Sequence, residues 1–417
     1  MGDLPEGWVI SRFEDTIQIL DSCRVPINNT ERLKRVEGKH ISELYPYYGA
    51  TGLVGCIDDF LLDGEYVLLG EDGAPFLDGF RDKAYIVRGK IWVNNHVHIL
   101  HSLLSNEYIC YYLNYINYRD FVSGTTRLKL TQSSMKSIPI ILPPLAEQQR
   151  IVEKLDELFS KLDKGVETLL IIKTQLKIYR QAVLKWAYEG KLTSSEWEIS
   201  ILGKVAAGLK IGPFGTLLHK EDYISGGVPV INPKHMKEYK ICNDDSVSIS
   251  KEKAADLQSY TIYENDVLIA RRGEMGRTAY VSEKENGWLC GTGSMIIRFL
   301  REYKGQLFTY LLSAEQSRKY LVDNCSGTTM SNLNEKIIKR LPMPQIPIED
   351  QIILLAAIES RLSVCDNLEA IADDSLTKAK ALRQSILKKA FTGQLVPQDP
   401  KDEPADKLLE RIQRNKV

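Results

Sequence analysis

A stretch of seventy residues occurs twice in this chain, with neither insertion nor deletion between the copies. Residues 123–192 align with residues 326–395 at an offset of 203, and 20 of these 70 positions are identical. Both copies carry a Ser-Gly-Thr-Thr motif near the start and end in Gly-x-Leu. A duplicated unit dictates the architecture around it, so it is assigned before any single motif. The repeat predicts a constant frame that presents two unlike surfaces.

Each copy of the repeat ends in a long helical pattern. The first begins at Pro143-Pro144 and ends at Gly190, and the second runs from Pro347 to Gly393. Proline is tolerated in a first helical turn, and glycine is favoured just beyond a last one. Apolar residues recur on alternating three- and four-residue steps, which is typical of a coiled coil. Roughly 45 residues at about 1.5 Å each predict helices of about 65–70 Å.

The two helices are expected to bury their apolar stripes on each other, because neither can cover its own. The alternative is that they are core helices of two separate globular domains, which their length disfavours. Gly165 interrupts the first stripe and should cost about 1 kcal/mol relative to alanine. The predicted pairing residues are Leu155, Leu162, Leu169, Leu176, Val183, Ile358, Leu362, Leu382 and Ile386.

Two unlike segments, about 1–140 and 195–343, carry short apolar runs broken by Gly, Asn and Asp. This pattern is typical of α+β domains with many short strands. Both segments open similarly, with Trp8-Val9-Ile10-Ser11 and Trp197-Glu198-Ile199-Ser200. The predicted parts are a domain at 1–143, a spacer helix at 144–194, a domain at 195–346, a spacer helix at 347–398, and a tail helix at 399–417 that packs near the N-terminus.

The bulk composition excludes several classes of protein. No apolar run approaches the ~18 residues of a membrane span, and the N-terminus lacks a leader pattern. Seven cysteines occur with no C-x-x-C pair, which predicts a reducing, cytoplasmic location. The net charge of −1 predicts that any binding of nucleic acid by the isolated chain is not tight.

The motifs of common catalytic sites are missing. The chain has no G-x-x-x-x-G-K-[ST], H-E-x-x-H, G-x-S-x-G or dinucleotide fingerprint. It also lacks the N-P-P-[YF] loop of amino-methyltransferases, since Asn232-Pro233 runs into Lys234. The sequence therefore predicts no catalytic residue, no ATP site and no methyl-donor site.

Two clusters invite a metal or acid–base interpretation. His96 and His98 would share a face of a strand and, with His101, could hold a metal. No cysteine or further histidine completes the set, so a polar surface or a DNA-facing strand is preferred and no metal is predicted. The carboxylate pairs Asp58-Asp59 and Asp244-Asp245 lie in turn-like sequence, where solvated loops are the usual explanation.

Other features favour nucleic acid. Arg271-Arg272-Gly273 and Arg277 follow an apolar run, and arginine suits bidentate contact with guanine or phosphate, although ordinary surface arginines explain each one equally well. The Ser-Gly-Thr-Thr motif offers hydroxyl and N–H groups to phosphates, or is only a turn. The predicted DNA-contacting residues are Tyr48, Thr51, Arg81, Asn95, Thr125, Thr126, Lys234, Arg271, Arg272, Arg277, Thr328 and Thr329.

These features resemble the specificity subunit of type I restriction–modification systems, and the similarity covers essentially the whole chain. Its marks here are Trp8 and Trp197, the two Ser-Gly-Thr-Thr motifs, Pro-Pro-Leu-x-Glu-Gln-Gln-x-Ile-Val at 143–152, and Leu-Lys-x-Ala-x-x-Gly at the two helix ends. The second copy departs from the helix-start pattern, because Ile346-Pro347 keeps one proline and Ile352 stands where the first copy has Gln149. The two docking surfaces for partners are therefore not equivalent in sequence.

The resemblance implies a non-catalytic α+β protein with a pseudo-twofold repeat. Each of its two target-recognition domains would read one half of a bipartite double-stranded DNA site, and an antiparallel coiled coil would fix the spacing. Two methyltransferase subunits would dock on the helices, and restriction subunits would join them. S-adenosylmethionine, ATP and Mg²⁺ would bind those partners, with no cofactor in this chain. The alternative is a stand-alone DNA-binding or interaction scaffold without enzymatic partners.

Overall fold

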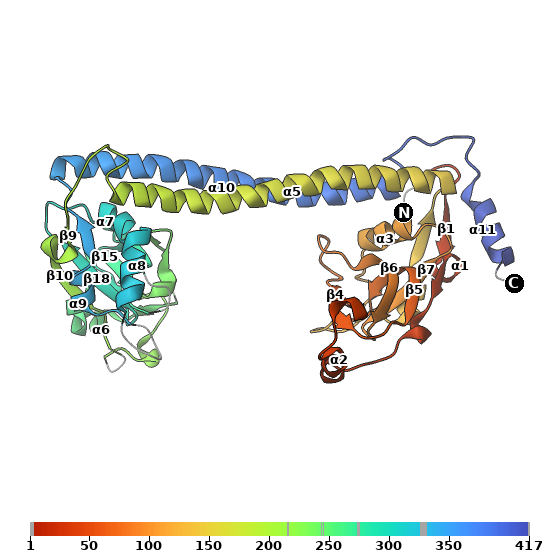
Figure 1. Cartoon of the computed structure of the whole chain (residues 1–417), viewed down its shortest axis with the longest axis horizontal. Helices are drawn as coiled ribbons and strands as arrows, with labels where there is room; N and C mark the ends of the chain where they lie inside the picture. The colour runs from red at the N-terminus through yellow and green to blue at the C-terminus, as the bar shows by residue number, and fades with distance from the viewer. Residues whose placement is uncertain are drawn as a thin grey trace. The chain divides into compact units, whose positions relative to one another are not determined.

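The computed structural model describes residues 4–214, 217–242, 244, 246–272, 276–325 and 332–415. The chain divides into two compact units (Figure 1). Unit 1 comprises Met1–Leu169 and Asp373–Val417, and unit 2 comprises Leu170–Ala372. Two helices of 44 residues each, α5 (Leu145–Tyr188) and α10 (Ile348–Phe391), contribute one half to each unit. The two predicted long helices and the two mixed α/β domains are thereby confirmed.

Unit 1 is built on a six-stranded sheet in the order β2-β7-β5-β6-β3-β4. All its neighbours are antiparallel except β3 and β6. Val67 and Leu69 of the central strand β5 face one apolar cluster and Leu68 faces another. Burial on both faces explains the continuous apolar run in this strand. The strands are β2 (Ile17–Ile19), β3 (Tyr45–Gly49), β4 (Gly52–Ile57), β5 (Leu62–Gly70), β6 (Ala84–Val93) and β7 (Val97–Ser102).

Helix α3 (Asn106–Tyr115) packs on strands β5 and β6, and the remaining elements of unit 1 surround this sheet. A separate two-stranded ribbon joins β1 (Val9–Arg12) to β8 (Pro139–Leu142). The other elements are α1 (Phe13–Thr16), η1 (Asp21–Cys23), α2 (Asn29–Val36), η2 (Ile41–Glu43), α4 (Gln132–Lys136) and α11 (Ala405–Asn415).

Unit 2 has a four-stranded sheet in the order β10-β18-β15-β16 and a three-stranded sheet in the order β14-β11-β17. The strands are β9 (Ile199–Ile201), β10 (Ala206–Ile211), β11 (Val228–Ile231), β12 (Met236–Lys237), β13 (Lys240–Ile241), β14 (Ser248–Ile249), β15 (Val267–Ala270), β16 (Thr278–Tyr280), β17 (Leu289–Cys290), β18 (Ser294–Phe299) and β19 (Pro342–Pro344). The helices are η3 (Leu202–Lys204), η4 (Lys220–Asp222), η5 (Pro233–His235), α6 (Lys251–Asp256), η6 (Gln258–Tyr260), η7 (Glu283–Glu285), α7 (Gly305–Leu312), α8 (Glu315–Asn324) and α9 (Glu335–Lys339).

The sequence repeat is also a repeat of contacts. Strand β19 pairs with β9 in unit 2 as β8 pairs with β1 in unit 1. The Trp8 indole Nε1 donates to Glu147 Oε2 at 3.0 Å, and the Trp197 indole donates to Asp350 Oδ2 at 3.3 Å. Each opening tryptophan is therefore held by the carboxylate in the first turn of the long helix that follows its own domain.

The buried carboxyl of Glu147 predicts a pH-dependent stability. Burial raises the pKa of Glu147, and the hydrogen bond from Trp8 only partly offsets it. The raised pKa means that ionised Glu147 destabilises the folded state, and this cost disappears as the pH falls below the ordinary pKa of about 4.3. We expect Glu147→Gln, which still accepts from Trp8, to raise the free energy of unfolding at about pH 7 but not at about pH 4. Equal effects in urea titrations at both pH values would contradict this assignment.

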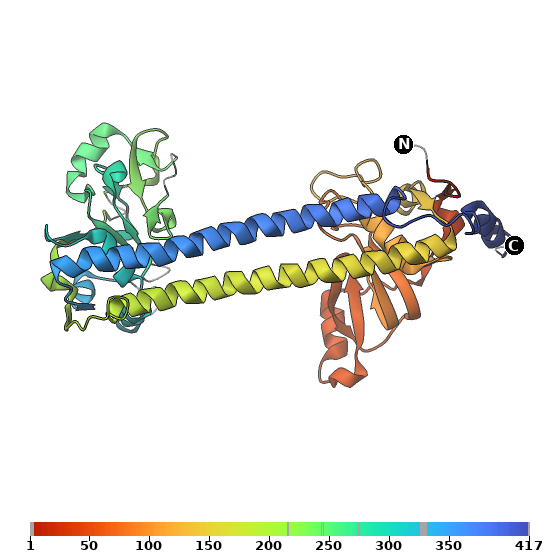
Figure 2. The same ribbon diagram turned by 90° about the horizontal axis from the view of Figure 1, so that it is seen from above.

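The halves of α5 and α10 lie side by side within each unit, in both views (Figure 2). Leu155 and Ile386 share the apolar cluster of unit 1, whereas Val183 and Ile358 share that of unit 2, so the helices run antiparallel. The same ion pair also occurs twice. Arg383 contacts Asp163 at 3.0 Å in unit 1, and the repeat-equivalent Arg180 contacts Asp366 at 2.5 Å in unit 2.

Eight of the nine predicted pairing residues are at least partly buried, and Leu382 is wrong. Its side chain is 51% exposed, while Arg383 lies 4.0 Å above the Phe159 ring and occupies the seam in its place. A straight α-helix drifts against a strict heptad, so the buried stripe moves by one position over several turns. The buried members are Leu155, Leu176, Val183, Ile358, Leu362 and Ile386, and the half-buried ones are Leu162 and Leu169.

Gly165 lies inside the continuous helix α5, and a Cβ added there would meet no atom within 4 Å. We expect Gly165→Ala to raise the free energy of unfolding by about 1 kcal/mol, because alanine restricts the unfolded chain and glycine does not. Urea unfolding of the full chain measures the change. Gly190→Ala is the contrasting control, since Gly190 has φ +74° and its Cβ would lie 1.9 Å from the Ser195 carbonyl oxygen. Stabilisation by both substitutions, or by neither, would contradict the expectation.

The C-terminal tail packs near the N-terminus, as the sequence predicts. The Ala405 N–H donates to the Gly7 carbonyl at 2.9 Å, and Arg150 Nη2 of α5 lies 2.6 Å from Asp402 Oδ2. Ala405 and Leu408 are buried in unit 1. Within the part of the chain that the structure describes, no helix is long and apolar enough to cross a membrane.

Candidate nucleic-acid interface

The Ser-Gly-Thr-Thr motif of the first copy forms an exposed loop in unit 1. The loop is closed by two backbone hydrogen bonds, from Ser123 N to Lys129 O at 3.0 Å and from Lys129 N to Ser123 O at 2.8 Å. Thr125 and Thr126 lie between these residues and are exposed. Gly124 adopts φ +101°, and a Cβ there would lie 2.5 Å from the Arg127 carbonyl oxygen, so the turn requires glycine. Thr328 and Thr329 of the second copy lie outside the described residues.

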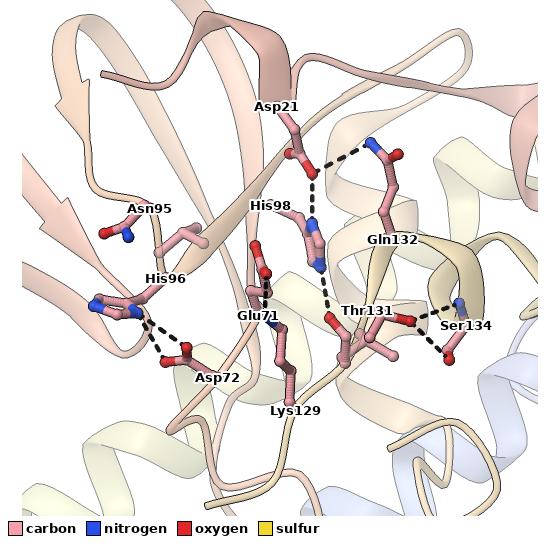
Figure 3. A network of polar contacts seen from close by, with 12 residues as sticks. Asp21, Glu71, Asp72, Asn95, His96, His98, Lys129, Thr131, Gln132 and Ser134 are labelled. Atoms are coloured by element: carbon pink, nitrogen blue, oxygen red, sulfur yellow. Dashed lines mark hydrogen bonds and ion pairs between the residues drawn. The ribbon is translucent and has the colours of Figure 1, made fainter. Parts of the chain in front are cut away.

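Two carboxylates that follow strand β5 hold the flanks of this loop. Asp72 contacts the Arg127 guanidinium and also lies 2.9 Å from His96 Nδ1. Glu71 lies 3.1 Å from Lys129 Nζ (Figure 3). It also lies 2.6 Å from Arg24 Nη1. Burial raises the pKa of Glu71, but its bonds to Arg24 and Lys129 outweigh it and lower the pKa below its ordinary value. The loop is thus fixed from below, while its hydroxyl and cationic groups remain accessible.

His98 lies beneath the loop and is 1% exposed. Its Nδ1 is 2.7 Å from Asp21 Oδ2, and its Nε2 is 2.9 Å from the Leu130 carbonyl oxygen. Figure 3 shows the His98 ring and Asp21 joined in this way. Burial raises the pKa of Asp21, but hydrogen bonding and attraction to His98 outweigh it and lower the pKa overall. Both neighbours of the ring are acceptors, which suits a doubly protonated imidazolium.

Asp21, Glu71 and His98 bring their ligand atoms within 4.8 Å of one another. A divalent cation there would have to displace Arg24 and Lys129 from Glu71. The Arg24 guanidinium and the Lys129 ammonium group already supply positive charge to the Glu71 carboxylate. The donor set therefore fits a network of ion pairs better than a metal ion. His96 and His98 contact different carboxylates, so these contacts do not bring the two rings to one joint site.

Two further predicted residues lie at or beside the turn between β3 and β4, and a third, Asn95, lies between β6 and β7. Tyr48 is half-buried against Tyr85, with 5.9 Å between ring centroids, and Thr51 is exposed in the turn. Asn95 is exposed, and its carbonyl accepts from Arg24 Nη1 at 3.4 Å. Because Arg24 also binds Glu71, Asn95 belongs to the network below the Thr125 loop. Arg24 and Asn95 are 71 positions apart in the sequence, so the sequence alone did not indicate that they are close.

Arg81 lies apart from that network. It is exposed on the segment between β5 and β6, and Gln384 of α10 donates to the neighbouring Gly79 carbonyl. The Arg81 loop therefore contacts the long helix within unit 1. Among the described residues, no hydrogen bond or ion pair joins Arg81 to the Thr125 loop, and its role in binding DNA stays a prediction.

The predicted basic residues of unit 2 differ in their surroundings. Lys234 lies 3.1 Å from Asp244, whose pKa is lowered to about 2, first by the Ser246 hydroxyl and then by Lys234. Arg277 Nη1 donates to the Pro233 carbonyl at 3.2 Å, next to Lys234, while Arg272 is exposed. Lys234 and Arg272 are exposed, and Arg277 is partly buried.

Arg271 does not lie on the exposed loop where the sequence placed it. It is 6% exposed, and its Nε donates to the Leu333 carbonyl at 2.9 Å. Burial lowers the pKa of Arg271, and the charge of Arg272 adds to this effect. The preceding strand β15 is buried on both faces, so the first arginine after it continues into the interior. Its guanidinium therefore binds a backbone carbonyl group.

One carboxylate of each pair considered from the sequence binds a cation, and Asp245 lies outside the described residues. Asp58 lies 2.6 Å from Arg35 and 2.6 Å from Lys39, while Asp244 binds Lys234. Such pairs favour the ionised carboxylate and so do not suit general acid–base catalysis. Sequence reasoning missed Glu71, Asp72 and Arg127, which position the loop. Their only signal was their closeness in sequence to a strand end and to the repeated motif.

Comparison with known proteins yields one family. The family described as "Type I restriction modification DNA specificity domain" matches residues 5–170 and again residues 194–370. A putative type I restriction enzyme specificity subunit of Haemophilus influenzae is 25% identical over 389 residues, covering 90% of this chain and 94% of that protein. The EcoBI specificity subunit of Escherichia coli is 28% identical over 337 residues, covering 73% and 70%.

Solved structures share the fold. One chain from a structure of the assembly and conformational transition of a type I R-M system matches with a TM-score of 0.71 and 18% identity, over 95% of this chain and 100% of that one. The HsdS subunit of Thermoanaerobacter tengcongensis matches with a TM-score of 0.53 and 17% identity, over 94% and 98%. At these identities the similarity supports the arrangement of two mixed domains and two long helices.

Proposed function

Because this chain belongs to the family of type I restriction–modification DNA specificity subunits, we propose that each of its two specificity domains reads one half of a bipartite DNA site. The observation that carries the proposal is the double match of the specificity domain, at residues 5–170 and 194–370, on a chain whose frame is repeated and whose inserts are unlike. Two unlike readers on one frame suit a target made of two unlike halves.

Contacts to the DNA backbone are assigned to the repeated part and base reading to the unlike part. The Thr125 and Thr126 loop offers hydroxyl groups beside Arg127 and Lys129, which suits phosphate oxygens. Tyr48, Thr51 and Asn95 belong to the unlike segment, and the Asn95 carbonyl accepts from Arg24 of the same network. Arg272, Arg277 and Lys234 are the corresponding candidates in unit 2. Arg81, Thr328 and Thr329 keep their predicted roles in DNA contact, whereas buried Arg271 is reassigned to the frame.

The long helices are proposed to fix the spacing of the half-sites and to bind two methyltransferase subunits. Exposed apolar side chains support docking, because large apolar patches on a soluble protein mark interaction surfaces. In unit 2 these include Ile171, Ile178 and Trp186 of α5 and Ile348, Ile352 and Ile353 of α10. S-adenosylmethionine, ATP and Mg²⁺ would bind the methyltransferase and restriction partners in the cytoplasm, and this chain would remain non-catalytic.

Co-expression with a methyltransferase subunit that carries the N-P-P-[YF] loop tests this function. Sequencing of methylated adenines in the host DNA should reveal one bipartite motif with a constant gap. The two proteins should also purify together. A stand-alone DNA-binding scaffold would bind DNA without the partner and produce no methylated motif, which would overturn the proposal.

The isolated chain should bind its target DNA more weakly than the assembled methyltransferase. Phosphate contacts dominate DNA affinity. A chain with a net charge of −1 has no excess of cationic side chains to make such contacts. We expect the dissociation constant to rise on the order of a hundredfold without the partners, as a loss of several phosphate contacts would cause. Fluorescence anisotropy at one salt concentration measures both forms. Equal affinity would show that the chain alone carries the electrostatic contacts.

A further inference from the structure

A leucine at the exit of the repeated motif makes the same backbone contacts in both units. Leu130 and Leu333 are equivalent positions of the repeat, and both are fully buried. Leu130 N donates to the Glu71 carbonyl at 2.7 Å, and Leu333 N donates to the Arg271 carbonyl at 3.2 Å. Glu71 and Arg271 each directly follow a central strand, β5 or β15. The N–H groups of both leucines are thus held by the same structural position.

The carbonyl groups of these leucines are held by different side chains. In unit 1 the Leu130 carbonyl lies 2.9 Å from His98 Nε2 of strand β7. In unit 2 the Leu333 carbonyl accepts from Arg271 Nε at 2.9 Å. His98 is 1% exposed and Arg271 is 6% exposed. The acceptor is the same, and two unrelated side chains from the interior reach it.

The segments that follow the two leucines are also alike. Thr131 caps helix α4 by accepting from Ser134 N, and its equivalent Asn334 caps helix α9 by accepting from Ile337 N. Each short helix then leads through β8 or β19 into a long helix. The leucine carbonyl therefore lies just before the segment that joins each domain to its long helix.

We propose that a buried cation in each domain, His98 as an imidazolium in unit 1 and Arg271 in unit 2, is a positioning residue for the repeated segment and acts through the leucine carbonyl. In unit 1 this contact fixes the loop that carries Thr125 and Thr126. The link to DNA rests on the function proposed above, whereas the anchoring itself does not. A guanidinium keeps its charge at every physiological pH, and an imidazole does not.

The surroundings of His98 favour the doubly protonated ring. With a single proton, one ring nitrogen would direct its lone pair at Asp21, at 2.7 Å, or at the Leu130 carbonyl, at 2.9 Å. The charged groups that face the ring are the carboxylates of Asp21 and Glu71, and Glu71 is bound in turn by Arg24 and Lys129. Asp21, the charged group that contacts the ring directly, is anionic. A second ring proton therefore completes the hydrogen bonds to both Asp21 and the Leu130 carbonyl. Loss of the proton would remove one of these hydrogen bonds.

A matched pair of variants separates positioning from core filling. In His98→Gln the side-chain amide reaches the place of Nε2 and can donate to the Leu130 carbonyl. In His98→Asn the amide reaches the place of Nδ1 and can donate only to Asp21. We expect hydrogen exchange at the Lys129 and Leu130 amides of the full chain to be about tenfold faster in His98→Asn than in His98→Gln, as one lost hydrogen bond implies. Equal exchange in the two variants would overturn the anchor.

Two further measurements complete the test. Nitrogen NMR of the full chain, which has six histidines, should show both His98 ring nitrogens protonated at about pH 6. A single protonated nitrogen there would overturn the imidazolium. Arg271→Met should speed exchange at the Leu333 amide to the same extent at about pH 6 and about pH 8 once the intrinsic rates are divided out, because no titrating group is involved. An effect of Arg271→Met that differs between the two pH values would contradict the role of Arg271 as the unit 2 counterpart of His98.

Methylation by the assembled complex separates the anchor from the function. We expect His98→Asn to lower the methylation rate of the mapped target about tenfold relative to His98→Gln. Altered exchange with unaltered methylation would uphold the anchor and overturn its link to DNA. Absence of any methylated motif with the unsubstituted chain would instead refute the function proposed above, and the exchange result would stand.

Discussion

Deleting one heptad from each long helix should shorten the gap between the half-sites by about three base pairs and leave both half-sites readable. Residues 166–172 of α5 and 374–380 of α10 are suitable segments, because the ion pairs Arg383–Asp163 and Arg180–Asp366 set the register and place them opposite each other. Seven residues remove about 10 Å of helix, and about 3.4 Å of duplex corresponds to one base pair. Methylation at the original gap should fall to background.

The deletion keeps the apolar stripe in phase, since seven residues are two turns of a coiled coil. The contacts of both helix ends are also unchanged, among them Trp8 with Glu147 and Trp197 with Asp350. Removing seven residues from α5 alone is the control, because it shifts one helix against the other and should abolish methylation at every gap. A changed half-site sequence with an unchanged gap would contradict the role of the helices as a spacer.

The long helices could be predicted from the sequence because their signals are local. Proline at each start, glycine after each end and an apolar repeat of three and four residues are independent of the fold around them. Leu382 shows the limit of this reasoning, since a strict heptad assigns it to the seam and Arg383 occupies that place. A drift of one position depends on what the facing helix offers, here the Phe159 ring. Sequence period alone does not contain that information.

The basic residues of unit 2 show why side-chain direction was harder to predict. Arg271 and Arg272 are adjacent, and one is buried while the other is exposed. Alternation along a strand normally separates such neighbours, but β15 is buried on both faces and its sequence carries no alternation. The repeat did contain a usable signal, because the identical Leu130 and Leu333 follow the motif at the same distance. What holds their carbonyl groups depends on tertiary contacts of residues far away in sequence.

The network in unit 1 illustrates the same limit for charged clusters. His96 and His98 are two residues apart and were considered as joint metal ligands, yet they contact Asp72 and Asp21 respectively. Those carboxylates lie 24 and 77 positions away in the sequence. Only the folded sheet brings them together. A pattern of histidines therefore predicted a polar cluster and not its chemistry.

Phe391→Ala should cost about 3–5 kcal/mol of the free energy of unfolding of unit 1, the second large effect expected here. Phe391 is the last residue of α10 and is 2% exposed. Its ring lies 5.5 Å from Tyr108, 5.2 Å from Tyr112 and 5.0 Å from Tyr115, all on helix α3. Truncation removes both the burial of the ring and these aromatic contacts, and it leaves a cavity between the long helix and the domain.

Urea unfolding of the full chain, followed by hydrogen exchange in each unit, measures this cost. Protection should fall in unit 1 and remain unchanged in unit 2, because Phe391 packs within unit 1. Tyr188 is the repeat-equivalent residue, and its hydroxyl donates to the Pro342 carbonyl at 2.6 Å. Tyr188→Phe keeps the ring and should cost only about 1 kcal/mol, in unit 2. A loss below about 1 kcal/mol in Phe391→Ala would mean that the α3 tyrosines refill the space, and that the ring does not fasten the helix to its domain.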